Sequence, residues 1–76
     1  MSTLPKVVKI KKLAEKGDAE AQYLMGMYHF KRLLKRGSDY EYDKAEFWLD
    51  KAVKQGHLDA KDARVKLEIS IFCKFG

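Results

Sequence analysis

The sequence predicts an all-α fold, a short solenoid of two antiparallel helical hairpins with four helices. Apolar residues recur at helical spacing in four successive segments. Single glycines at positions 17, 37 and 56 separate these segments, as expected for helix ends. The surroundings of Gly17 and Gly56, 39 residues apart, also match one another, which is typical of stacked helical repeats. With 76 residues, the whole chain, 1–76, is predicted to be one domain.

The first two helices are predicted from their apolar stripes and their ends. The first runs from Pro5 to Lys16, because Pro suits a first helical turn, where its missing N–H costs nothing. The second follows Asp18, a good N-cap residue, and ends at Lys35 or Arg36. Their predicted core stripes are Val7, Ile10 and Ala14 in the first helix, and Ala21, Leu24, Met25 and Tyr28 in the second.

The third and fourth helices differ in how clearly the sequence defines them. The third is predicted from about Tyr42 to just before Gly56, and the fourth from about Leu58. The end "VKLEISIF" alternates apolar and polar residues, which is the period of a strand. A lone strand would have no partner here, so we expect helix to about residue 72. The predicted core residues are Ala45, Trp48, Leu49, Ala52 and Val53 in the third helix, and Ala60, Ala63 and Leu67 in the fourth.

Two motifs give the chain a family resemblance. The first has the form A-x-x-G-x-x-x-A, followed by a Met-Gly pair, and the second is "YDKAEFWLDKAVKQG". Together they resemble a SEL-one-like repeat, a relative of the tetratricopeptide repeats, over about residues 13–67. The resemblance implies a right-handed solenoid with one full repeat and a half-repeat on either side. The matching residues are Ala14, Gly17, Ala21, Met25, Gly26, Tyr42, Lys44, Ala45, Trp48, Ala52 and Gly56.

The chain departs from the family pattern in the second copy and between the two motifs. The Gly-rich loop is replaced by "HFKRLLKRGSDYE", about one helical turn longer. His29 and Glu41 stand where Tyr and Asp are usual, and Arg64 and Val65 replace the second Leu-Gly pair. Gly26, which would cost a helix about 1 kcal/mol relative to Ala, is predicted to allow close helix packing.

Catalysis needs convergent reactive groups, and the sequence offers none that we can identify. His29 is expected to be packed and His57 to be exposed, and two histidines alone do not make a zinc site. Cys73 is expected to be a buried small residue rather than a nucleophile. We therefore expect no enzyme, no cofactor and no metal.

Composition limits the cellular setting. The single cysteine cannot form an internal disulfide, which fits a reducing compartment, so we expect a cytoplasmic protein. The sequence contains no apolar run of the roughly 20 residues needed to cross a bilayer, and its N-terminus has no leader-like stretch. The net charge of +5 is concentrated in two basic runs.

The first functional hypothesis is a protein–protein interaction module that docks on one larger protein as an adaptor or an inhibitor. The family resemblance implies binding without chemistry, and phage-type counter-defence inhibitors are proteins of this size. The identity of the partner is not predicted. The expected partner-binding residues lie beside the core stripe of the second helix: Tyr23, Met27, Phe30, Lys31, Arg32, Lys35 and Arg36.

Two alternatives remain open. One is binding of nucleic acid or a ribonucleoprotein through the Lys/Arg runs, although the acidic segment "SDYEYDKAEFWLD" weakens the positive field and no recognition motif is present. Whether the two runs share a face is not predicted. The other is self-association through an apolar tail, which could instead cover the first helix. Its residues are Ile69, Ile71, Phe72 and Phe75.

Overall fold

Four helices, packed in sequence order as hairpins, make up the described chain: α1 (Pro5–Glu15), α2 (Ala19–Arg36), α3 (Asp39–Lys54) and α4 (Leu58–Phe75). The computed structural model describes the backbone of residues 5–75 and the side chains of residues 6–70. The all-α prediction is confirmed. The alternating segment "VKLEISIF" lies within α4, because no strand is available in residues 5–75 to pair with it.

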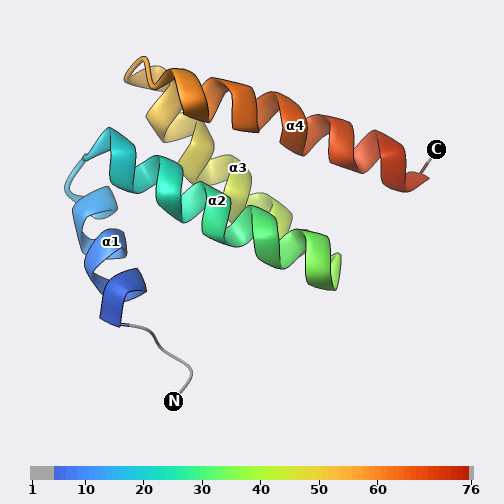
Figure 1. The fold of residues 1–76 in the computed structure, drawn as a ribbon, viewed down its shortest axis with the longest axis horizontal. Coiled ribbons are helices and arrows are strands. Elements are labelled where there is room, and N and C mark those ends of the chain that lie inside the picture. The colour runs from blue at the N-terminus through green and yellow to red at the C-terminus, as the bar shows by residue number, and fades with distance from the viewer. Residues whose placement is uncertain (1–4, 76) are drawn as a thin grey trace.

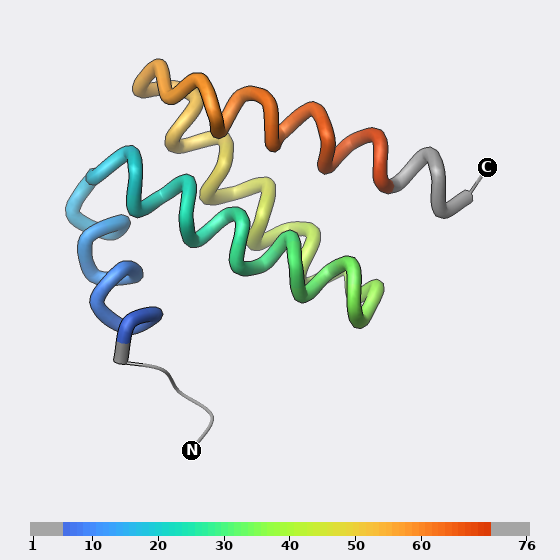
Figure 2. The backbone as a smooth tube through the Cα atoms, viewed as in Figure 1, coloured from blue at the N-terminus to red at the C-terminus, as the bar shows by residue number. Residues whose placement is uncertain are grey.

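The central unit is the antiparallel pair formed by α2 and α3 (Figure 1). α1 packs against α2 and α4 packs against α3, with a smaller contact between α4 and α2. The turns that join α1 to α2 and α3 to α4 lie at the same end of the molecule, as the tube in Figure 2 shows, and the α2–α3 turn lies at the other end. The result is a thin stack, with extents of 37 × 34 × 15 Å.

The two turns at this end have the same backbone geometry. Gly17 and Gly56 both adopt positive φ, at 107° and 85°. In each turn the glycine N–H donates to the carbonyl three residues back, and the next N–H donates to the carbonyl five residues back, at 2.9–3.1 Å. This is the Schellman arrangement, which favours glycine at the left-handed position. The sequence match 39 residues apart therefore reflects a repeated helix end.

Side-chain caps start the helices after these turns. Asp18 Oδ1 accepts the N–H of Ala21 at 3.0 Å, as expected for the start of α2. His57 Nδ1 plays the same part for α4 and accepts the N–H of Ala60 at 3.0 Å. The predicted capping hydroxyls of Ser2 and Thr3 before α1 lie outside the described residues.

The prediction that the third helix begins near Tyr42 is wrong. α3 begins at Asp39, because Ser38 Oγ accepts the N–H of Tyr40 at 3.2 Å and provides an N-cap. α2 also continues to Arg36, so the connection consists only of Gly37, in the left-handed conformation, and Ser38. The segment "HFKRLLKRGSDYE", which was expected to form a longer loop, is therefore helical except at Gly37 and Ser38.

The core consists of two groups of buried side chains. One joins α2, α3 and α4, and the other joins α1 to α2 and α3. Leu24 was expected in the core stripe of α2, but it is 39% exposed because α1 covers the neighbouring side of α2, at Ala21 and Met25. The first group contains Phe30, Ala45, Leu49, Ala52, Ala60, Ala63 and Leu67, and the second contains Ala14, Ala21, Met25 and Trp48.

Gly26 marks the closest approach of α2 and α3. A Cβ atom added at this position would lie 2.5 Å from both Cγ and Cδ2 of Leu49, and 3.2 Å from its backbone nitrogen. Leu49 is fully buried and has little room to shift. The predicted packing role of Gly26 is therefore confirmed.

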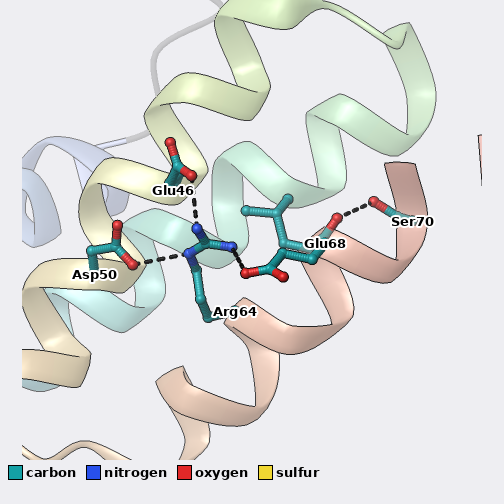
Figure 3. Close-up of polar contacts among 6 residues, drawn as sticks. Glu46, Asp50, Arg64, Glu68 and Ser70 are labelled. Carbon is teal, nitrogen blue, oxygen red and sulfur yellow. Dashed lines mark hydrogen bonds and ion pairs between the residues drawn. The ribbon is translucent and has the colours of Figure 1, made fainter. Parts of the chain in front are cut away.

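α4 is attached to α3 by a charged cluster as well as by the core (Figure 3). The Arg64 guanidinium donates to Glu46 at 2.7 Å and to Asp50 at 2.9 Å, both on α3, and to Glu68 at 2.8 Å on its own helix. Arg64 lies 39 residues after Met25, the same spacing as between Gly17 and Gly56, and therefore corresponds to Met25. Val65, which corresponds to Gly26, is 52% exposed, so it faces no neighbour that would require a glycine.

The contact between Gly26 and Leu49 gives a first prediction. Gly26→Ala should lower the free energy of unfolding by about 1–3 kcal/mol, because overpacking outweighs the gain in helix propensity of about 1 kcal/mol. Chemical denaturation measures this change. Leu49→Ala should cost less in the Gly26→Ala background than in the native protein, and additive effects of the two substitutions would contradict the steric explanation.

Candidate partner-binding surface

The α2 residues predicted to contact a partner do not all reach the surface. Phe30 is only 7% exposed and belongs to the core group shared by α2, α3 and α4, so it is a packing residue. Tyr23 is half-buried, and its ring stacks on His57 with centroids 4.7 Å apart. Met27 is also half-buried. Tyr23 and Met27 pack at the edge of the core group that contains Phe30, and helical spacing alone does not show how far the neighbouring helices cover that edge.

An apolar hollow of about 220 Å³ opens between α1 and α2. Leu24 and Met27 on α2 form part of its wall, opposite Val7 and Ile10 on α1. Lys31 is exposed and lies at the same hollow. The complete lining is Val7, Ile10, Leu24, Met25, Met27, Tyr28 and Lys31.

The apolar surface of α2 extends beyond this hollow. Leu34 is 68% exposed and follows Leu24 and Met27 at i+10 and i+7, which places the three residues on one side of the helix. We call Leu24, Met27, Lys31 and Leu34 the α2 surface. Leu24 and Leu34 were not among the residues predicted to bind a partner. The exposure of Leu24 depends on where α1 lies, and the sequence does not give that position.

The basic residues of α2 that were predicted to bind a partner do not form one patch. Arg32 is directed toward α3, where its Nε donates to Glu41 Oε2 at 2.9 Å and its guanidinium lies 5.5 Å from the centre of the Tyr28 ring. Lys31 lies beside α1. Lys35 and Arg36 are exposed in the last turn of α2.

Glu41 is a buried carboxylate held by two residues of α2. Only 4% of it is exposed, and it accepts hydrogen bonds from His29 Nδ1 at 2.8 Å and from Arg32 at 2.9 Å. Burial raises the pKa of Glu41, but the hydrogen bonds from His29 and Arg32 outweigh this effect, so the pKa lies below its ordinary value. His29 is largely buried, as expected.

His57 was predicted to be exposed, and that prediction is wrong. Only 13% of its side chain is accessible. Its Nδ1 accepts the α4 cap hydrogen bond, and its Nε2 donates to Glu20 at 2.6 Å. The ring also stacks on Tyr23. These three contacts fix the side chain between α2 and the start of α4.

Two glutamines link the repeated turns. Gln55 Nε2 donates to the carbonyl of Gly17 at 2.8 Å and to Gln22 Oε1 at 2.9 Å. Gln22 is buried and donates to the carbonyl of Ala14 at 3.1 Å. The end of α3 is thereby attached directly to the end of α1.

A second surface runs along α3. Tyr40, Lys44, Phe47 and Lys51 follow one another at i, i+4, i+7 and i+11, and we call these four residues the α3 ladder. Lys44 Nζ lies 5.6 Å from the centre of the Tyr40 ring, and Lys51 Nζ lies 4.8 Å from the centre of the Phe47 ring. The only signal of this surface in the sequence is that Tyr40 and Phe47 fall off the core stripe at a spacing of seven.

α4 also leaves apolar side chains uncovered. Leu58, Val65 and Ile69 are exposed at i, i+7 and i+11, on the side of the helix opposite Ala60, Ala63 and Leu67. Of the residues predicted for self-association, Ile69 is therefore exposed. Ile71, Phe72 and Phe75, like Cys73, lie outside the residues whose side chains are described.

The structure thus defines a small four-helix all-α domain with exposed apolar surface. Comparisons with protein-family models, curated proteins and solved structures find no match. In the part of the chain that the structure describes, no helix is both long enough and apolar enough to span a membrane.

The surroundings of Glu41 give a second prediction. Glu41→Gln should lower the free energy of unfolding at pH 7 by about 1–2 kcal/mol, because His29 and Arg32 lose a charged acceptor. A carboxylate with a lowered folded-state pKa stabilises the protein fully above its ordinary value of 4.5. That stabilisation is lost as the pH falls through the folded-state value.

The difference between the native protein and Glu41→Gln should therefore shrink below about pH 4.5. Denaturation at several pH values measures it. An exposed carboxylate, changed by Asp59→Gln, serves as the control and should show a much smaller difference at pH 7. A difference for Glu41→Gln that stays constant from pH 7 to pH 3 would contradict the role assigned to this carboxylate.

Proposed function

We propose that this protein is a non-enzymatic protein–protein interaction module that docks on one larger protein through the α2 surface. The observation that carries the proposal is the apolar hollow between α1 and α2, continued along α2 by the exposed Leu34. Scattered apolar residues are normal on a protein surface, but an apolar hollow bordered by exposed Leu side chains on one helix is typical of a binding site.

The helix arrangement supports a divergent SEL-one-like repeat. Two Schellman turns recur 39 residues apart, and Gly26, one of the residues that match the family pattern, lies at the closest approach of α2 and α3. In this proposal α2 and α3 form the full repeat, α1 and α4 are half-repeats, and the stack is a right-handed solenoid. Proteins of this kind bind partners without chemistry, so the role is that of an adaptor or an inhibitor, phage-type counter-defence inhibitors included.

The proposed contact residues differ from the sequence prediction in two ways. Leu24 and Leu34 are added because they are exposed beside Met27 and Lys31. Phe30 is removed because it is buried, and Tyr23 because its half-buried ring stacks on His57. Lys35 and Arg36 lie one and two residues beyond Leu34 and supply positive charge at the end of the surface. Arg32 belongs to the Glu41 cluster and helps to hold α2 on α3.

A capture experiment with matched variants tests the proposal. The immobilised protein is incubated with nuclease-treated lysate, and retained proteins are identified by mass spectrometry. Leu24→Ser combined with Leu34→Ser should abolish retention of a stoichiometric partner, because these two side chains supply most of the exposed apolar area of the α2 surface. The matched control combines Leu13→Ser with Leu58→Ser, two exposed leucines outside this surface, and should retain the partner.

Circular dichroism keeps the experiment interpretable. Both double variants should have the helix content of the native protein, because the replaced side chains are largely outside the core. Equal retention by the native protein and by the α2 surface variant would show that the partner docks elsewhere.

The second candidate function is binding of nucleic acid or a ribonucleoprotein through the basic residues. It is favoured by exposed lysines on α1, together with Lys35 and Arg36 at the end of α2. If a protein makes 6–10 phosphate contacts, its affinity falls by roughly 10³–10⁵ between 50 mM and 200 mM salt. A partner that is retained from untreated lysate, is lost after nuclease treatment and shows this salt dependence would support nucleic-acid binding over docking at the α2 surface.

A further inference from the structure

We propose that the groove between α1 and α3 binds an acidic amphipathic helix of a partner protein. This groove has a volume of about 500 Å³ and lies on a different side of α1 from the hollow of the α2 surface. It is formed by other residues, so the inference and the proposed function can be tested separately.

The charge of the groove indicates an anionic ligand. Lys11 and Lys16 line it from the side of α1, and Lys44 and Lys51 line it from α3. Glu15 is the one carboxylate among the lining residues. Within residues 6–70, the ion pairs of the molecule involve Arg32, Arg64, Lys66 and the two histidines, and none involves these four lysines. A cluster of like charges that form no ion pairs within the protein attracts and orients a ligand of opposite charge.

The aromatic side chains add an apolar component. Phe47 is 50% exposed between Lys44 and Lys51, and its ring meets Trp48 edge-on with centroids 5.0 Å apart. Trp48 is nearly buried and lies at the base of the groove with Ala14. The groove therefore offers two positive positions with an apolar position between them.

This pattern fits a helix that lies along α3. Lys44 and Lys51 are seven residues apart, which is about 10 Å along a helix axis. Carboxylates seven residues apart on a partner helix have the same separation, and residues three and four positions after the first carboxylate would face Phe47. An acidic residue, an apolar pair and a second acidic residue would thus match the α3 ladder.

Single-stranded nucleic acid fits the same surface less well. Bases bind proteins by stacking on exposed aromatic faces. Here Lys51 Nζ lies over the ring of Phe47 at 4.8 Å, and Lys44 Nζ lies over the ring of Tyr40 at 5.6 Å. A stacking base would have to displace both ammonium groups, whereas a carboxylate can pair with each of them in place.

The experiment uses Trp48, the only tryptophan of the chain, as a reporter. The full-length protein is titrated with a synthetic helical peptide that has Glu seven residues apart and two Leu residues between them. Binding should change the Trp48 emission to saturation. Lys44→Gln combined with Lys51→Gln should raise the dissociation constant about tenfold or more, because both pairing positions are lost.

Three controls make the result decisive. Lys61→Gln with Lys66→Gln removes the same charge from exposed positions on α4 and should change the dissociation constant less than about twofold. The Leu24→Ser and Leu34→Ser variant should bind the peptide like the native protein, which separates this groove from the α2 surface. A peptide of the same composition with shuffled Glu and Leu positions should bind much more weakly.

Three outcomes would overturn the inference. Equal affinity for the shuffled peptide would show attraction by charge alone. Tighter binding of a single-stranded oligothymidine that competes with the peptide would assign the groove to nucleic acid. No binding of the peptide up to millimolar concentration, by Trp48 emission and by isothermal titration calorimetry, would show that the groove is not its binding site.

Discussion

The close approach of α2 and α3 at Gly26 is the constraint on which the rest of the molecule depends. Leu49 fills the space that a Cβ at Gly26 would need, so the two backbones lie closer than larger residues would allow. α1 and α4 then pack on different parts of this pair. Without that central contact neither outer helix would find its apolar partners, because the two core groups both draw residues from α2 and α3.

Most of the core side chains are small, so polar contacts have an important part in fixing the helices relative to one another. Each buried alanine contributes little apolar area, and a chain of this size has few large side chains to add. The Glu41 cluster fixes α3 on α2, Arg64 fixes α4 on α3, and Gln55 links the two repeated turns. The buried ion pairs of Glu41 add little net stability, but an alternative packing would leave its charge unpaired, which favours one arrangement.

Local sequence patterns were sufficient for the four helices and for their described ends, except the start of α3. Gly17 and Gly56 could be recognised because only a residue without Cβ adopts their backbone conformation easily. The start of α3 was missed because Gly37 and Ser38 act together as a two-residue connection. Leu24 and Phe30 were assigned to the wrong surroundings, since one edge of a helix is buried or exposed according to where its neighbours lie.

The candidate sites also depend on where neighbouring helices lie, which local sequence patterns do not determine. The hollow beside the α2 surface and the groove beside the α3 ladder are each lined by residues of sequence-distant helices, so no local motif predicts them. Charged partners such as Glu41 and Arg32 were also assigned separately from the sequence, since their meeting depends on the α2–α3 contact.

α1 forms a wall of both the apolar hollow and the basic groove. It rests mainly on α2, and its end is attached to α3 through the glutamine link. A ligand in either depression would therefore restrict α1. Less conformational entropy would then be lost when a second ligand binds in the other depression. If both depressions bind ligands, this shared helix would link them thermodynamically, and occupation of one would favour occupation of the other without a change in average structure.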